Sequence, residues 1–145
     1  MVVSLKPTLQ ILQGYLSASG WFPGGASIGE PLAAPGDMAS AVFLARSEHP
    51  STTLSGTIER RWVTIRIYRN ALAEPRENIE FDLDTVVSQV QSDLLGDFDL
   101  GSTVRAIDVT SMSVEYGYQT FDTTIYRIAD LQLPMIIDDS ASFTA

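Results

Sequence analysis

The sequence predicts one α+β domain, in which a mostly antiparallel sheet of four to five strands carries two amphipathic helices on one face. Three observations support this fold class. Two segments place apolar residues at helical spacing, four segments have the composition of β-strands, and polar turn-forming stretches separate them. Strands joined by short turns pair antiparallel, and two amphipathic helices cover one face of such a sheet. The predicted order is helix, strand, strand, helix, strand, strand.

The first helix is predicted over residues 5–19. Its apolar residues follow the spacing i, i+4, i+7, i+11: Leu5, Leu9, Leu12 and Leu16. Ser4 is a candidate N-cap, and Pro7 suits a first turn, where the amides have no partner within the helix. Gly20 is placed to end the helix.

Two loops are predicted to be flexible. Residues 20–38 hold five glycines and three prolines, a density that leaves no room for a regular element. Residues 46–56 form a second polar break. Trp21 and Phe22 begin the first loop, and we expect them to pack on the core, with an exposed contact for a partner as the alternative.

Two strands are predicted next. Residues 40–46 are an apolar run typical of a buried strand, and residues 57–69 give the clearest strand pattern in the chain. Alternation places one set of its side chains toward the core: Val63, Ile65 and Ile67. The other set points outward: Trp62, Thr64, Arg66 and Tyr68.

A charged connector leads to the second helix, which Asp82 or Asp84 is expected to cap and Gly96 to end. Its apolar stripe is Leu83, Val86, Val87, Val90 and Leu94.

The last two strands are predicted over residues 103–118 and 123–134, with a hairpin turn over residues 118–122. A bulge near Thr110 or Ser111 would reconcile the uneven alternation of the first of them. The final strand is expected to place one set of residues on one face: Ile125, Ala129, Leu131 and Leu133. Residues 138–145 are small and polar, so we expect a frayed tail.

The composition suits a single domain over residues 1–145, since 145 residues with 45% hydrophobic content can bury their own core. The chain has no cysteine, which excludes disulfides, thiolate nucleophiles and cysteine-based metal sites. We find no targeting segment and no apolar run near the ~20 residues that span a bilayer. We therefore expect a soluble protein, made in the cytoplasm, with no membrane contact.

The net charge of −9 argues against nucleic-acid binding, which needs basic side chains to neutralise phosphates. The charge is also uneven. Residues 1–79 hold six acids and seven bases, whereas residues 80–145 hold twelve acids and two bases. A solvated acidic surface accounts for this difference, and a molecule whose acidic side repels something is the alternative.

The sequence offers little for catalysis. Its single histidine, His49, lies in a polar loop, and one histidine without cysteine cannot anchor a typical transition-metal site. Residues 97–101 are a poor match to a calcium loop. We predict no enzyme activity, no cofactor, and no catalytic or metal-binding residue. A small carboxylate-dependent hydrolase is the alternative from another class, with these candidates: Asp82, Asp84, Asp97, Asp99 and Asp108.

Arginines gather on the clearest strand, although the chain has only one lysine, Lys6. Arginine and aromatic side chains are favoured at protein interfaces, so the strand is a candidate contact with a subunit or partner. The residues concerned are Arg60, Arg61, Trp62, Arg66, Tyr68 and Arg69. An ordinary polar sheet face is the alternative.

The layout resembles the tail-terminator, or tail-completion, proteins of bacteriophages with long non-contractile tails. The matching features begin with the leading helix LKPTLQILQGYL, the glycine- and proline-rich loop, and the strands SAVFLAR and ERRWVTIRIYR. They continue with the helix opening FDLDTVVSQVQ and the strands VRAIDVTSMSVEYGY and TTIYRIADLQLP. The resemblance covers nearly the whole chain, as a pattern and an order of elements.

The resemblance implies a structural protein of the virion, located at the head-proximal end of the tail. Such a protein forms a homo-oligomeric ring, a hexamer, which caps the tail tube, ends its polymerisation and presents a docking surface to the head-side connector protein. DNA passes through the ring without specific binding. An acidic lining would repel its phosphates, and the candidate residues are Asp82, Asp84, Asp93, Asp97 and Asp99. Another head–tail connector or a tail-tube subunit is the alternative within this class.

Overall fold

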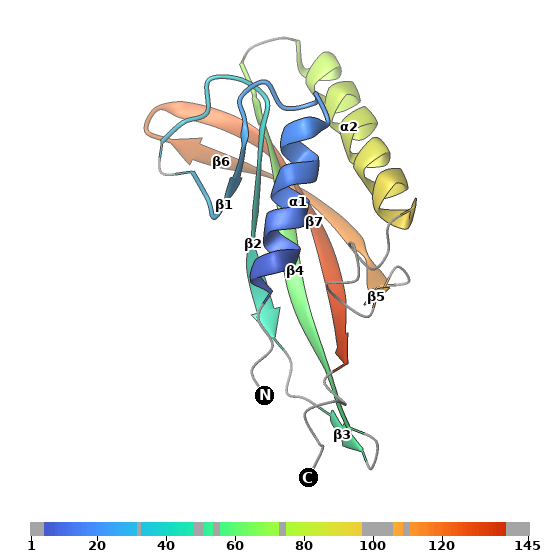
Figure 1. The fold of residues 1–145 in the computed structure, drawn as a ribbon. Helices are drawn as coiled ribbons and strands as arrows, with labels where there is room; N and C mark the ends of the chain where they lie inside the picture. Colours follow the sequence, from blue (N-terminus) through green and yellow to red (C-terminus); the bar gives the residue numbers. More distant parts are fainter. Residues whose placement is uncertain are drawn as a thin grey trace.

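The computed structural model describes residues 5–31, 33–47, 51–53, 56–72, 75–96, 106–108 and 111–138. These residues form an α+β fold, as predicted, with two helices and seven strands in the described part (Figure 1). The elements are α1 (Lys6–Ala18), β1 (Ala26–Ile28), β2 (Ala39–Ser47), β3 (Ser51–Thr53), β4 (Gly56–Asn70), α2 (Arg76–Gly96), β5 (Ala106–Ile107), β6 (Ser113–Phe121) and β7 (Thr124–Asp138).

All seven described strands belong to one mixed sheet. The main path runs β1-β2-β4-β7-β5, while β3 pairs with β4 and β6 pairs with β7. The β1–β2 pair is parallel and the other pairs are antiparallel. The predicted order of two helices and four strands is confirmed only in part. It holds for the longer elements, and three short strands add to it: β1, β3 and β5.

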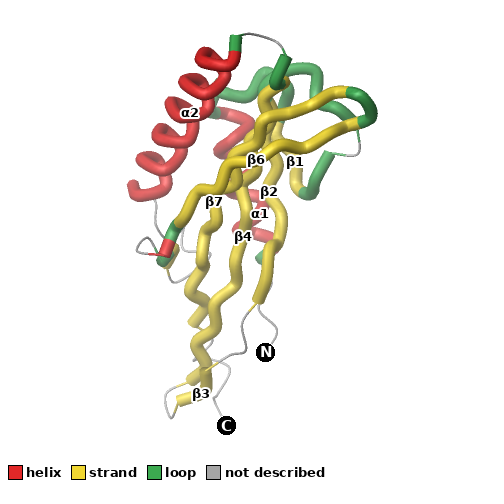
Figure 2. Tube along the Cα trace, turned by 180° about the vertical axis from the view of Figure 1, so that it is seen from behind, coloured by secondary structure: helices red, strands yellow, loops and turns green. Residues whose placement is uncertain are grey.

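Both helices lie on the same face of the sheet, α1 over β1 and β2 and α2 over β4 and β7 (Figure 1). Viewed from behind, the strands stand in front of the helices (Figure 2). The end of the sheet where β3 pairs with β4 extends beyond both helices (Figure 1). Neither described helix has the length and apolar character needed to cross a bilayer.

Helix α1 forms almost where the sequence predicts it. Leu12 and Leu16 are fully buried, and the left-handed backbone of Gly20, with φ of 81°, ends the helix as expected. The capping prediction was wrong, because the N-cap is Leu5 and it makes no side-chain capping bond. The first turn contains a proline, which has no backbone N–H group, so one fewer amide there needs a capping partner.

Helix α2 begins at Arg76, so Asp82 and Asp84 lie inside it and do not cap it. The carbonyl of Pro75 accepts hydrogen bonds from the amides of Asn78 and Ile79, which starts the helix within the charged connector. Ile79 extends the buried stripe by one turn ahead of Leu83. The stripe predicted from Leu83 to Leu94 is otherwise confirmed.

The main core lies between the helices and the sheet. It contains the inward set predicted for β4, each member of which has no exposed surface: Val63, Ile65 and Ile67. From β7 it contains Ala129, Leu131, Leu133, Met135 and Ile137. Phe22 also joins it, as expected, whereas Trp21 remains 37% exposed and lies outside the cluster. A partner contact at Trp21 stays a prediction.

A second, smaller cluster lies on the opposite face of the sheet. It is formed by Ala41, Tyr68, Tyr126 and Ile128, with Phe43 and Phe121 packed against it. The rings of Phe121 and Tyr126 meet edge to face at 5.4 Å. Tyr68 and Thr64 point away from the helices, as alternation requires, but both are buried rather than solvent-facing.

The loop predicted over residues 20–38 contains β1, which pairs with β2 from Ser40 to Val42. Gly24 donates its amide to the carbonyl of Met38, and a Cβ at Gly24 would lie 2.6 Å from the Asp37 carbonyl oxygen. Glycine therefore permits this close approach. In the range 46–56, strand β3 and the ends of β2 and β4 replace the predicted break, while residues 48–50, with His49, and 54–55 lie outside the described residues.

The strand predicted over residues 103–118 is instead two strands, β5 and β6, on the same edge of β7. Asp108, Ser111 and Met112 are not in strand conformation, so β5 and β6 are separate strands where a bulge near Thr110 or Ser111 was predicted; Val109 and Thr110 lie outside the described residues. The hairpin turn is at Asp122 and Thr123, later than predicted. Strand β7 continues past the predicted end to Asp138, and the rest of the predicted tail lies outside the described residues.

Candidate functional site

The six candidate interface residues of β4 lie on two faces of the sheet and do not form one patch. The even-numbered ones, Arg60, Trp62, Arg66 and Tyr68, alternate with the core residues and face away from the helices. Arg61 and Arg69 have the parity of the core residues and lie on the helix-bearing face. The partner role predicted for the set remains a prediction.

Arg66 is held by a network on the face away from the helices. Its Nε donates to Asp130 Oδ1 at 2.7 Å and its Nη2 to Asp130 Oδ2 at 3.0 Å. Its Nη1 donates to Gln119 Oε1 at 3.1 Å and also pairs with Glu30. The hydrogen bonds to Asp130 raise the pKa of Arg66, so this side chain stays charged and its donors are already used within the chain.

Two more of these arginines pair with carboxylates at the two ends of β4. Arg69 Nη2 donates to Asp82 Oδ2 at 3.2 Å, which joins β4 to α2. Its Nη1 lies 3.9 Å from Asp37 Oδ1. Arg60 pairs with Asp108, just after β5. Arg60 and Arg69 are nine positions apart, which is roughly 30 Å along a strand. Their partners Asp108 and Asp82, two of the hydrolase candidates, are therefore far apart.

The two aromatic members of the set differ in accessibility. Trp62 is partly exposed, and Arg46 from β2 covers its ring at 4.6 Å. Tyr68 has no exposed surface, and its hydroxyl has no hydrogen-bond partner among the described residues. Burial raises the pKa of Tyr68 to about 12, and the positive charge of nearby Arg66 lowers it only in part. Arg66 makes no hydrogen bond to the Tyr68 hydroxyl. A partner protein cannot reach Tyr68 in this conformation.

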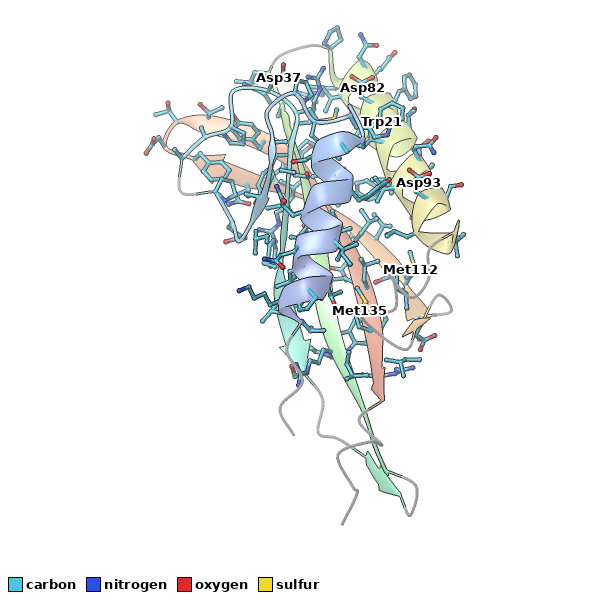
Figure 3. All side chains as sticks on the ribbon, in the orientation of Figure 1. Trp21, Asp37, Asp82, Asp93, Met112 and Met135 are labelled. Carbon is cyan, nitrogen blue, oxygen red and sulfur yellow. The ribbon has the colours of Figure 1, made fainter. Side chains whose placement is uncertain are left out.

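Three of the five candidate channel-lining acids lie on α2, and Asp97 and Asp99 fall outside the described residues. Asp93 accepts hydrogen bonds from Tyr15 on α1 and from Gln89 Nε2 at 3.0 Å. Burial, reinforced by that bond to Asp93, raises the pKa of Tyr15. Asp84 is exposed. Figure 3 shows Asp82 and Asp93 on α2, and Trp21 just beyond the C-terminal end of α1.

The charge asymmetry of the sequence is also an asymmetry in space. Helix α2 carries five acids, Glu77, Glu80, Asp82, Asp84 and Asp93, against the single base Arg76. Helix α1, on the other side of the same face, has Lys6 as its one charged residue. Four of the twelve acids of residues 80–145 therefore lie on α2, which together with Glu77 makes this helix more acidic than α1.

Exposed apolar side chains form two patches that the sequence analysis missed. Ten large apolar side chains are exposed among the described residues, and six belong to these patches. The hairpin patch, near the β6–β7 turn, consists of Leu72, Tyr116, Tyr118 and Ile125. The edge patch, between α1 and the strands β1 and β2, consists of the exposed Ile28 and Leu44 together with the half-buried Leu9 and the buried Leu5.

Arg127 packs against the two tyrosines of the hairpin patch and is itself hydrogen-bonded to α2. Arg127 lies over the ring of Tyr118 at 4.7 Å and over that of Tyr116 at 5.7 Å, and its Nε donates to Glu80 Oε1 at 2.8 Å. Burial raises the pKa of Tyr116, and the nearby carboxylates of Asp84 and Glu80 raise it further. Ile125 was expected on the core side of the last strand, and it shares that face but remains 41% exposed because α2 does not cover it.

One signal for the hairpin patch was available in the sequence. Tyr116 and Tyr118 are two residues apart in a strand, so they share a face. The edge patch had no such signal, because its members come from α1, β1 and β2. Within the described residues, no group of three or more metal-ligating side chains comes together.

Comparison with known proteins adds no relative. No protein-family model matches the chain, and no curated protein matches it.

Proposed function

We propose that this protein is a structural subunit of a bacteriophage tail, and that it forms a ring which caps the tail tube. The ring ends tube polymerisation and presents the surface on which the head-side connector protein docks. Its action is steric, through protein surfaces, and requires no bond chemistry. In the mature virion the ring is at the head-proximal end of the tail.

The observation that carries this proposal is the presence of two separate apolar patches on one small domain. Leu72 is 76% exposed in the hairpin patch and Leu44 is 62% exposed in the edge patch. Exposed apolar side chains that gather in patches mark surfaces for other proteins. A ring subunit needs two different contact surfaces, one for each neighbour, and this chain offers two.

The charge of α2 supports a place beside the DNA path. Its exposed acids, Glu77 and Asp84 among them, would repel phosphate if the helix faced the channel. Asp93 bonds to the uncharged Tyr15 and Gln89 and keeps its net negative charge, whereas Arg69 offsets the charge of Asp82. Both carboxylates help to fix the position of the helix. DNA then passes the ring without being held.

The test is a tube-polymerisation assay with the tail-tube protein of the same phage. The tube protein assembles alone or with increasing amounts of this chain, and negative-stain electron microscopy records tube lengths and ends. We expect shorter tubes, each with one added ring at one end. An unrelated acidic protein of similar size is the control.

Two outcomes would contradict the proposal. Tube lengths that stay the same as the amount of this chain increases would contradict the terminator function. Stacked rings or tubes built from this chain alone would identify a tube subunit, because a terminator stops after one ring.

A further inference from the structure

Strand β6 is an edge strand of the sheet, because among the described strands it pairs with β7 alone. It runs for nine residues, contains no proline, and each of its residues is exposed or half-buried. An edge strand of this kind presents a row of backbone amides and carbonyls without a partner strand, and proteins usually shorten or cover such edges. The accessible length of β6 therefore makes it a candidate binding site.

The register of the sheet shows which backbone groups of β6 are free. The amide of Ala71, just after β4, donates to the carbonyl of Ile125, so the odd-numbered residues of β7 bond to β4 and the even-numbered ones to β6. The even-numbered residues of β7 lie opposite the odd-numbered residues of β6. The even-numbered residues of β6 therefore direct their amides and carbonyls away from β7: Val114, Tyr116, Tyr118 and Thr120.

The opposite edge of the sheet, at β1, is short and partly covered. Strand β1 has three residues, and its Ala26 carbonyl accepts a hydrogen bond from Gln13 Nε2 of α1 at 3.0 Å. On β6, among the described residues, Arg127 is the side chain that bonds to the backbone. Its Nη1 donates at 3.1 Å to the carbonyl of Gly117, which is one of the groups that face β7. The outward set of β6 keeps its donors and acceptors available.

We propose that the free edge of β6 binds an extended segment of another protein, which joins the sheet as a further strand. In this mode of recognition the backbone hydrogen bonds supply affinity, and the side chains at alternate positions supply specificity. The inference does not rest on the proposed ring. The added strand lies beyond β6, on the side away from β7, so Ile125 of the hairpin patch stays accessible to a neighbouring subunit.

The side chains of β6 indicate which segment fits. Tyr116 and Tyr118 are 45% and 65% exposed, and Tyr116 lies opposite the core residue Ala129, which places both rings on the helix-bearing face. The residues of the segment beside these rings should be apolar. On the other face Glu115 is exposed and lies opposite Asp130, so the residues of the segment beside Glu115 should be basic.

The occupant is therefore a segment in which basic and apolar residues alternate. A second copy of this chain is a less suitable source. Its net charge is −9, and β6 itself carries one acid and no base.

Amide hydrogen exchange followed by NMR tests the pairing residue by residue. The isotope-labelled full chain is measured alone and with an excess of a synthetic peptide in which lysine and valine alternate. Without peptide, the amides of Tyr116 and Tyr118 should exchange fast, and those of Gly117 and Gln119, which face β7, should exchange slowly. With peptide, exchange at Tyr116 and Tyr118 should slow at least about tenfold, whereas Gly117 and Gln119 should change little.

A control peptide separates backbone pairing from charge attraction. The same sequence with every backbone amide N-methylated keeps its charges and side chains but cannot donate to the edge. Its affinity, measured by the same NMR titration, should be at least about tenfold lower.

Two variants of the chain test the position of the segment. Glu115→Lys should weaken binding of the lysine–valine peptide about fivefold, because the base beside it is then repelled. Opposite Asp130 the new lysine is tolerated by the fold. Glu77→Lys makes the same change in net charge on α2 and should alter the affinity less than about twofold.

Four results would overturn the inference. Slow exchange at Tyr116 and Tyr118 without peptide, at every protein concentration, would show that the edge is already covered within the chain. Protection that grows with protein concentration would assign the edge to a second copy. Equal binding of the N-methylated peptide would show charge attraction alone. No binding of the lysine–valine peptide at about 1 mM would show that β6 does not accept a strand.

This test and the tube-polymerisation assay are independent. Tubes that are shortened as expected, with no peptide bound at β6, would remove the strand addition and leave the terminator function. Peptide pairing at β6 with no effect of the chain on tube length would do the reverse.

Discussion

The two faces of β4 are built from the same strand but differ in how they are stabilised. On the helix-bearing face, Val63, Ile65 and Ile67 are fully buried among apolar side chains of both helices and β7. On the opposite face, Thr64, Arg66 and Tyr68 alternate with them and are covered by polar bonds and a small aromatic cluster. The stability of the first face comes from buried apolar area, and that of the second face comes from individual hydrogen bonds, ion pairs and ring contacts.

This difference teaches that alternation assigns a side chain to a face but does not say what covers that face. Arg66 and Tyr68 are candidates for a partner contact, and within the subunit Asp130 already holds Arg66 while Tyr126 and Phe121 pack against Tyr68. The apolar surface available to partners lies elsewhere, in the hairpin and edge patches.

The largest effect is expected on the helix-bearing face. Ile65→Ala should lower the free energy of unfolding by about 2–5 kcal/mol, because it removes buried methyl groups and leaves a cavity. Urea denaturation followed by circular dichroism measures this change. Ile125→Ala is the matched control, and since Ile125 is 41% exposed it should cost less than about 1 kcal/mol. Equal losses for the two variants would mean that Ile65 does not lie in a packed core.

The polar face should respond next. Asp130→Asn removes the charged acceptor of two hydrogen bonds from Arg66 and should cost about 1.5–3 kcal/mol by the same measurement. Glu115 lies directly opposite Asp130 on β6, and like charges in this position repel. Glu115→Gln should therefore leave the protein at least as stable as before. A loss for Glu115→Gln as large as that for Asp130→Asn would contradict this view of the network.

A smaller loss is expected for Tyr126→Phe. The hydroxyl of Tyr126 donates a hydrogen bond to the carbonyl of Pro35, which ties the loop between β1 and β2 to the aromatic cluster. Its removal should cost about 0.5–1.5 kcal/mol and should speed amide hydrogen exchange in that loop. Two amides of this loop report on it: that of Gly29, which donates to the Val42 carbonyl, and that of Met38, which donates to Asp37. Unchanged exchange at both would show that the tyrosine does not hold the loop.

The smallest effect on stability at neutral pH is expected for Tyr68→Phe. Like Tyr126→Phe it removes a tyrosine hydroxyl, but this hydroxyl has no hydrogen-bond partner among the described residues. Because the Tyr68 hydroxyl is buried and unpaired among the described residues, its removal should be neutral or slightly stabilising. A loss as large as that of Tyr126→Phe would reveal a hydrogen bond at Tyr68.

The same variant should differ from the parent protein at high pH. The pKa of Tyr68 is raised from 10.0 to about 12 in the folded state, so between these values the unfolded chain loses the proton first. The contribution of Tyr68 to stability is thus complete below pH 10 and is lost as the pH rises toward 12. Tyr68→Phe should show a shallower fall in thermal midpoint over this range, and an identical fall in both proteins would exclude the raised pKa.

Helix α1, the core stripe of α2 and the inward set of β4 were predicted from the sequence because each rests on spacing within one segment. The start of α2 was misplaced because Asp82 and Asp84 match a capping pattern, while the actual start uses Pro75, whose carbonyl accepts two amides. The split between β5 and β6 was missed because their strand character comes from pairing with one long partner, β7. The six candidate interface residues were correctly predicted to lie on one strand, β4. They do not form one patch, because alternation places them on two faces of the sheet.

The sequence by itself determined where apolar residues recur at helical or strand spacing, that the chain lacks cysteine, and that its second half is acidic. Only the tertiary structure decided which charges are matched and which apolar side chains gather at the surface. The physical reason is the distance along the chain between the partners. Arg66 meets Asp130 across 64 residues, and the edge patch joins α1 to β2, so neither contact leaves a periodic signal in any one segment.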